Sequence, residues 1–210
     1  ATAVASIARD FGLERWEDLM PYTAGAFVMF GLGSIPAGRL GDLWGRRRMM
    51  LVFYIGMGLS SLAVALTQTP IQMAVALTVL GLFSAIYHPV GIPFLVQGSQ
   101  TPGLTIGING LAGNMGIALA ALSTGFWVQF FGWRMAFVAP AILSLVCGWF
   151  FWRYAPTESA PPAKKSVTHV HLPRHLALRT VVVMIGSAIA SSLLFNFTTN
   201  GNAQLMAERL

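Results

Sequence analysis

The sequence predicts an all-α fold, a polytopic membrane helix bundle of about six transmembrane helices, and two observations predict it. The first is composition: 55% of the 210 residues are hydrophobic and 10% are charged, with a mean hydropathy of +0.67, whereas a soluble domain carries about a quarter charged residues. The second is the stretch from Met49 to Trp133, which contains no Asp, Glu, Lys or Arg and is long enough for about four bilayer crossings of ~20 residues each. These observations exclude a typical soluble enzyme and a disordered chain.

The first full span is the uncharged segment Leu19–Gly38, which lies between Asp18 and Arg39. Its length suffices to cross a hydrocarbon core of ~30 Å at about 1.5 Å per residue of helix. The second span, Met49–Gln68, ends at a Gln-Thr-Pro sequence that is typical of a helix boundary. Before both, Ala1–Ala8 is interpreted as the end of an earlier helix, and the chain is therefore expected to be a fragment.

The third span, Ile71–Val96, contains Pro89 and Pro93. Each proline removes a backbone hydrogen bond of the helix, so a kink is expected here, and broken helices of this kind commonly border a cavity. The remaining spans follow in order along the chain: Leu104–Phe130, Met135–Trp152 and, after the polar stretch Arg153–Arg179, Thr180–Phe197.

The distribution of basic residues sets the orientation of these spans. If the turn that contains Arg46, Arg47 and Arg48 is cytoplasmic, nine basic residues lie inside and four outside, which together account for all 13. The basic surplus therefore indicates a positive-inside protein whose partner is membrane lipid. Nucleic acid is not an expected partner, because the long charge-free run offers no clustered basic stripe to phosphates.

Small residues recur along two of the predicted helices. Gly33, Ala37, Gly41 and Gly45 follow one another at four-residue spacing, and the fourth span has glycines at positions 107, 110, 113 and 116. Such stripes let helix backbones approach closely in membranes.

The strongest local signal lies between the first two spans, where residues 38–48 read GRLGDLWGRRR and are predicted to form a short, tight loop. Its three glycines permit helix ends to approach and turn. Asp42 and Arg46 stand four residues apart and can pair on one helical face. Arginines alone would indicate a positive-inside anchor, whereas the acid and the spaced glycines favour a dedicated motif.

This segment resembles the signature of the major facilitator superfamily of secondary transporters, found in the loop between the family's helices 2 and 3. The matching residues are Gly38, Leu40, Gly41, Asp42, Gly45, Arg46 and Arg47. Leu43 stands where the family usually has a basic residue. Asp42 therefore lacks one charged partner and is expected to pair with Arg46 or with groups outside the chain. The resemblance covers the whole chain, and the sequence Gly-Trp-Arg at 132–134 is similar to the family's outer turn between helices 5 and 6.

The resemblance implies two six-helix halves, a substrate site near the membrane midplane and alternating access. Residues 1–153 would be the N-terminal transmembrane half, from the end of helix 1 to helix 6. Residues 154–179 would be the central cytoplasmic loop and residues 180–210 helix 7, so the remaining C-terminal half of the carrier is an expected partner. It also implies that the motif is a gate, whose acid contacts the other half and helps to close the cytoplasmic side: Gly38, Asp42, Gly45, Arg46 and Arg47.

Costly polar side chains lie in the spans that the family places around its cavity. They are His88, beside the kink residues Pro89 and Pro93, and the asparagines Asn109, Asn114, Asn196 and Asn200. One interpretation of His88 is that it carries a coupling proton or contacts an anionic substrate. The other is a neutral ring bonded to a carbonyl that the kink frees. Asn114, about ten residues into its helix and thus near the bilayer centre, either contacts the solute or joins helices.

The expected function is proton-coupled efflux of a small organic solute across the bacterial inner membrane. The segments Tyr87-His88-Pro89 and Gly110–Gly116 resemble the fosmidomycin-resistance-like group of efflux carriers. Two alternatives stay open. One is an uptake carrier for anions, nitrate-like or organic acids, and the other is a half-carrier in the membrane that does not transport.

An enzyme is not expected, because Ser84 and His88, the one pairing of nucleophile and base found, lack an orienting acid and oxyanion donors. No cofactor and no metal are expected either. His169, His171 and His175 are interpreted as part of a solvated basic linker, since no Cys or carboxylate completes a metal shell there.

Overall fold

The computed structural model describes residues 2–157 and 173–196, and in these ranges every regular element is a helix. Six helical segments there are long and apolar enough to cross a membrane. The predicted all-α membrane fold is therefore confirmed. By its internal contacts the chain divides into two units, Ala1–Pro162 and Ala163–Leu210, and each is described by itself.

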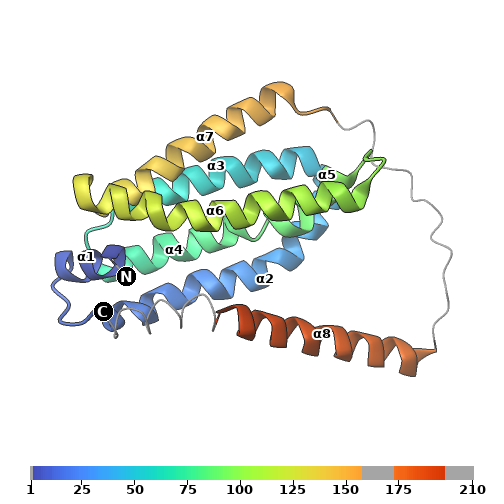
Figure 1. The fold of residues 1–210 in the computed structure, drawn as a ribbon, viewed down its shortest axis with the longest axis horizontal. Coiled ribbons are helices and arrows are strands. Elements are labelled where there is room, and N and C mark those ends of the chain that lie inside the picture. Colours follow the sequence, from blue (N-terminus) through green and yellow to red (C-terminus); the bar gives the residue numbers. More distant parts are fainter. Residues whose placement is uncertain (1, 158–172, 197–210) are drawn as a thin grey trace. The chain divides into compact units, whose positions relative to one another are not determined.

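The helices of the first unit follow one another in sequence (Figure 1). They are α1 (Thr2–Asp10), η1 (Trp16–Leu19), α2 (Met20–Trp44), α3 (Arg46–Ala65), α4 (Pro70–Ser84), η2 (Tyr87–Gly91), α5 (Ile92–Val96), α6 (Pro102–Phe131) and α7 (Met135–Tyr154). Of these, η1 is a 3₁₀ turn and η2 is π-helical. In the second unit α8 spans Arg174–Asn196.

The predicted loop between the first two spans is almost entirely helical. α2 continues through the motif to Trp44 and α3 begins at Arg46, so Gly45 alone separates them. Gly45 has φ 96°, a left-handed conformation that glycine adopts without the steric penalty of a side chain. The prediction of a loop from Gly38 onward was wrong, because polar and charged residues end the apolar segment without ending the helix.

The third span departs from a regular α-helix near its prolines, where the sequence predicts a kink: α4 ends at Ser84 and a π-helical turn precedes α5. One other predicted boundary also shifts. α8 begins at Arg174 rather than at the predicted Thr180, because a helix can carry charged residues where it leaves the hydrocarbon. Residues 174–179 of the predicted central loop are therefore helical, and residues 158–172 lie outside the described ranges.

Glycine allows the helices of the first unit to pack closely. α2 lies against α4, where a Cβ added to Gly81 would sit 2.8 Å from Ala26 Cα. α3 lies against α7, where a Cβ added to Gly148 would sit 2.8 Å from Tyr54 Cβ. The stripe predicted on α2 supplies the buried residues of that helix: Gly33, Ala37 and Gly41.

α6 differs from these helices, because none of its residues is buried by the parts of the chain that the structure describes. A Cβ added to Gly107, Gly110, Gly113 or Gly116 would meet no atom within 4 Å. The close approach predicted for this second stripe is therefore not found within the described residues.

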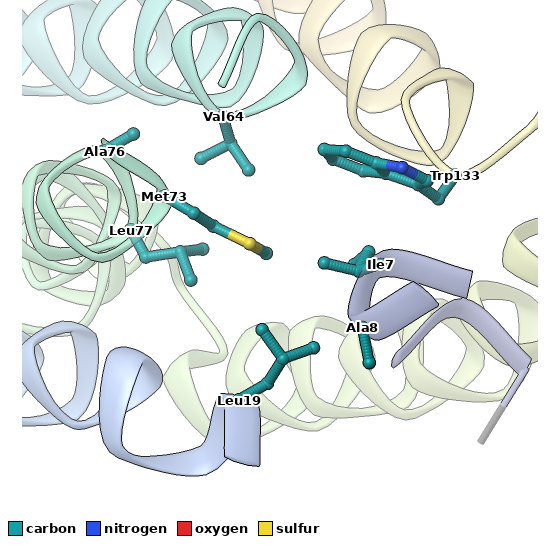
Figure 2. Packing of buried hydrophobic residues seen from close by; sticks show 8 residues of the cluster. All are labelled: Ile7, Ala8, Leu19, Val64, Met73, Ala76, Leu77 and Trp133. Carbon is teal, nitrogen blue, oxygen red and sulfur yellow. The ribbon is translucent and has the colours of Figure 1, made fainter. Parts of the chain in front are cut away.

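Two hydrophobic cores lie toward opposite ends of α3. The first, at the end that holds α1, consists of Ile7, Ala8, Leu19, Val64, Met73, Ala76, Leu77 and Trp133. Figure 2 shows the side chains of Met73 and Ile7 pointing toward one another between Val64 and Leu19. The second core lies beside the motif and consists of Ala37, Met49, Met50, Ile86 and Val90. α3 contributes Val64 to the first and Met49 to the second, so these cores fix both ends of the bundle.

Candidate gating motif and substrate path

The motif places Asp42 in the last turn of α2 and Arg46 at the start of α3. Arg46 Nη2 lies 3.6 Å from Asp42 Oδ1, the pairing that their spacing predicts. The Asp42 side chain is 74% exposed and that of Arg46 26%. Solvent therefore screens the pair, which contributes at most about 1 kcal/mol to stability. An ion pair of this strength can exchange partners readily.

Arg46 also reaches α5. Its Nη1 donates to the Pro93 carbonyl at 3.3 Å and to Gln97 Oε1 at 3.4 Å. One guanidinium therefore joins the motif to the end of the kinked third span. Gln97 was not singled out from the sequence, where its polar side chain directly after an apolar span is a weak signal.

Arg47 points to a different helix. Its Nε donates to the Ala155 carbonyl at 3.3 Å and its Nη2 to the Trp152 carbonyl at 2.6 Å. Carbonyls in the last turn of a helix lack intrahelical partners, and a cation at this end interacts favourably with the helix dipole. Arg47 thus ties the motif to the end of α7, a contact that sequence reasoning did not predict.

The glycines of the motif lie against the kink of the third span. A Cβ added to Gly38 would sit 3.3 Å from Pro89 Cβ, and one added to Gly41 would sit 2.9 Å from a methyl carbon of Val90. Val90 is fully buried, at 0% exposure. Because glycine stands at both positions, α2 can approach η2 closely, and the motif and the kinked segment pack together.

The kinked segment itself departs from α-helical geometry where the prolines stand. Pro89 lies inside the π-helical turn Tyr87–Gly91, and Pro93 lies in the first turn of α5. Pro89 has no N–H to donate to the preceding turn. π-Helical turns within longer helices are frequent at functional sites, which directs attention to the side chains that this turn presents.

His88 is one of these side chains, and it is exposed. Its ring meets Phe30 of α2 edge-on, with centroids 6.1 Å apart, and Tyr87 at 5.8 Å. Among the described residues no hydrogen bond to its ring nitrogens is formed, so the bond to a freed carbonyl is not found there. Aromatic contacts thus hold the ring against Phe30 of α2 and against Tyr87 of its own turn.

The asparagines have different surroundings. Asn109 accepts a hydrogen bond from the Tyr87 hydroxyl at 2.5 Å, which links α6 to η2. Asn114 is exposed and has no hydrogen bond among the described residues. Asn196 is the last residue of α8, whose side chain lies outside the description, and Asn200 lies outside the described residues altogether. The structure thus brings Asn109 together with the kink, whereas Asn114 forms no such contact among the described residues.

A second polar cluster, not predicted from the sequence, lies at the end of the first unit opposite the motif. Asp10 Oδ2 accepts from Trp133 Nε1 at 3.1 Å and from Arg134 Nη1 at 2.7 Å. Arg134 Nη2 also donates to the Thr67 carbonyl at 3.2 Å. The hydrogen bond from Trp133, followed by that from Arg134, holds the pKa of Asp10 below its ordinary value.

This cluster borders an open cavity of about 500 Å³, which Ser6 and Arg9 also line. In Figure 1 the α2–α3 junction and α1 stand at opposite ends of the first unit. The arginines of the motif therefore lie at one end of the first unit and Arg134 at the other, while the orientation of these ends across the membrane stays a prediction. Within the described ranges no group of three or more His, Cys, Asp and Glu side chains is placed to hold a metal ion, and His169 and His171 lie outside those ranges.

Comparison with known proteins gives a family match over nearly the whole chain. Residues 1–207 match the Major Facilitator Superfamily. The match includes the motif, the kinked segment and the outer turn that carries Trp133 and Arg134.

Three relatives illustrate the similarity. The "Tetracenomycin C resistance and export protein" of Streptomyces glaucescens is 31% identical over 150 residues, which cover 69% of this chain and 28% of the relative. The "Puromycin resistance protein pur8" of Streptomyces alboniger is 27% identical over 147 residues, 69% of this chain and 29% of the relative. The "Gallate transporter" of Pseudomonas putida is 27% identical over 157 residues, 74% of this chain and 34% of the relative. The chain thus spans about a third or less of the length of the curated relatives that it matches.

Proposed function

The chain belongs to the major facilitator superfamily, and from this premise we propose that it is part of a secondary transporter that exports a small organic solute in exchange for protons. It is an integral, multi-pass membrane protein of transporter type. The bacterial inner membrane is the proposed location, since the relatives come from bacteria. Membrane lipid, the transported solute, an ion gradient and the rest of the carrier are the proposed partners.

The observation that carries the proposal is the packing of the motif on the kinked third span. Arg46 holds Asp42 and the Pro93 carbonyl at the same time, and the glycine at 41 admits Val90. A change in the partner of Asp42 would therefore alter the contacts that hold the segment carrying His88. This coupling is what alternating access requires of a gate, a bistable contact linked to a wall of the cavity.

Relatives with resistance and export in their names support efflux as the direction of transport. Resemblance of the residues around His88 and Asn114 to the fosmidomycin-resistance-like group supports the same direction. His88 is exposed and has no hydrogen bond among the described residues, and in this proposal it carries the coupling proton. Asn114, exposed likewise, is the proposed contact for the solute.

Uptake of an organic acid is the second candidate. The relative named as a gallate transporter favours it. In exchange for protons, the solute accumulates on the acidic side of the membrane, whereas in co-transport with protons it accumulates on the opposite side. Flux assays therefore separate export from uptake.

The gate is tested by the substitution Asp42→Asn in the complete protein, assayed for solute export from energised cells or vesicles. Export should fall by about tenfold, which corresponds to about 1.4 kcal/mol in the rate-limiting conformational step, while the amount of protein in the membrane stays unchanged. Glu14→Gln is the matched control, because Glu14 is an exposed acid before η1, far along the chain from the motif. Normal export by Asp42→Asn would reduce the motif to a structural anchor.

A further inference from the structure

Consecutive side chains of the π-helical turn point to different neighbours. Tyr87 donates its hydroxyl hydrogen to Asn109 Oδ1 of α6, at 2.5 Å. His88 instead meets Phe30 of α2. The turn therefore stands between α6 and α2, with one aromatic ring directed to each.

The ring of Tyr87 is held along its length. It packs against Phe53 of α3, with centroids 5.6 Å apart. The ring also lies close to Gly91, where an added Cβ would sit 3.1 Å from it. Tyr87 is partly buried, and its hydrogen bond to Asn109 is partly buried as well. Geometry of this kind fixes the ring to a single position relative to α6.

The turn packs against α2 through Pro89 and Val90, but it has few polar restraints. Pro89 cannot donate a backbone hydrogen bond, and no side chain caps the turn at Ile86. In the apolar interior of a membrane, a polar side chain is stabilised by a partner on a neighbouring helix. The hydroxyl of Tyr87 is thus the polar contact that joins this irregular backbone to α6 among the described residues.

We propose that the Tyr87–Asn109 hydrogen bond is a positioning contact, which holds the π-helical turn against α6 and thereby sets where His88 and the carbonyl of Pro93 stand. Asn109 then acts through Tyr87 and does not itself touch the solute. Tyr87 is a positioning residue for the same reason. Its relevance to transport rests on the proposed function, whereas its effect on the turn does not.

The chain offers a matched control in Tyr54. Its ring is also partly buried and packs against Phe53, at 5.1 Å, but its hydroxyl forms no hydrogen bond among the described residues. Tyr87→Phe and Tyr54→Phe therefore remove the same atom from the same aromatic cluster. The two variants differ in whether a bond to another helix is lost.

The experiment measures the complete carrier in lipid nanodiscs by hydrogen exchange of residues 84–92 and by the rate at which diethyl pyrocarbonate modifies His88. Tyr87→Phe and Asn109→Leu should each speed both processes by about threefold to tenfold, the range expected for one interhelical hydrogen bond in a membrane protein. The double variant should match either single one, because both substitutions break the same bond. Tyr54→Phe should behave as the unmodified protein.

Two results would overturn the proposal: Tyr87→Phe behaving like Tyr54→Phe, or the effects of Tyr87→Phe and Asn109→Leu adding in the double variant. Transport is a separate readout. Tyr87→Phe and Asn109→Leu should change KM by the same factor as one another, and likewise the maximal rate. A larger effect of Asn109→Leu on KM would show that Asn109 contacts the solute directly. If the unmodified carrier moves no solute, the proposed function fails while the exchange measurements still decide the positioning role.

Discussion

Removal of the Asp10 carboxylate should destabilise the end of the first unit that lies opposite the motif. Asp10 Oδ2 accepts two hydrogen bonds, from Trp133 Nε1 and from Arg134 Nη1. Trp133 is 3% exposed and belongs to the core shown in Figure 2. Asp10→Ala would therefore leave a partly buried indole N–H without its acceptor, whereas Arg134 would keep the Thr67 carbonyl.

The magnitude follows from these contacts. An unsatisfied buried donor costs about 1 to 3 kcal/mol, and the partly buried indole N–H belongs at the lower end of this range. The half-exposed ion pair adds less than about 1 kcal/mol. Asp10→Ala should thus lower the free energy of unfolding by about 2 kcal/mol, or Tm by about 4 to 8 °C for a chain of this size. Asp10→Asn keeps an oxygen that can accept from Trp133 and should lose only the contribution of the charge, about 0.5 kcal/mol.

The pH dependence has a definite sign. Because the folded protein holds the pKa of Asp10 below its ordinary value, the carboxylate stabilises the fold at neutral pH. This stabilisation is lost as the pH falls from about 3.9, the ordinary value for Asp, through the lower pKa of the folded state. Over that window, the stability difference between the unmodified protein and Asp10→Asn should shrink.

Thermal unfolding in detergent, followed by intrinsic tryptophan fluorescence, measures the stability loss of Asp10→Ala, that of Asp10→Asn and the pH dependence of both. Comparison with Asp10→Asn at each pH cancels the contribution of the other carboxylates. Equal stability of Asp10→Ala and Asp10→Asn at neutral pH would contradict this prediction, because loss of the acceptor for the indole N–H would then carry no cost.

Two further predictions concern the helix contacts and the proposed proton path. Gly81→Ala should destabilise the chain by about 1 to 3 kcal/mol, since the new methyl group meets the Ala26 backbone. Gly31→Ala, where a Cβ meets nothing within 4 Å, should have no destabilising effect in the same thermal assay. Equal losses of stability in the two variants would contradict the packing of α2 on α4. His88→Gln should flatten the pH dependence of transport, because glutamine does not titrate, and an unchanged profile in the flux assay would favour a structural role for the ring.

The membrane spans could be predicted because the signal is carried by each residue separately. Apolar side chains in runs of about 20 residues indicate a bilayer crossing whatever their neighbours are. Helix ends are less accessible to this reasoning. Arg39 and Asp42 end the apolar run, yet α2 continues to Trp44 until a glycine with positive φ stops it. Charge density marks where the hydrocarbon ends, and backbone conformation marks where the helix ends.

Contacts between distant residues could not be predicted for a related reason. Asp42 and Arg46 are neighbours on the sequence, so helical spacing alone indicates their pairing. Arg47 meets Trp152, and Asp10 meets Trp133, only because α3 packs against α7 and α1 lies by the α6–α7 turn. No periodicity encodes such contacts.

The candidate site contains one feature that the sequence predicts and one contact that it does not. Proline in an apolar run predicts a departure from the regular helix near Pro89, and the backbone is π-helical there. The partner of Asn109 follows from the direction of the Tyr87 side chain, which depends on the extra residue that a π-helical turn accommodates. A regular helix would point the Tyr87 side chain in another direction, so its hydrogen bond to Asn109 could not be predicted from the sequence.

Gradient-driven flux in inverted membrane vesicles that contain the complete protein tests proton-coupled export most directly. A panel of small organic anions and cationic drugs would be offered outside, with the vesicle interior acidified by respiration. We expect accumulation of at least one compound that stops when a protonophore collapses the gradient and is reduced by Asp42→Asn. Folded protein in the membrane with no gradient-dependent flux of any compound would contradict it.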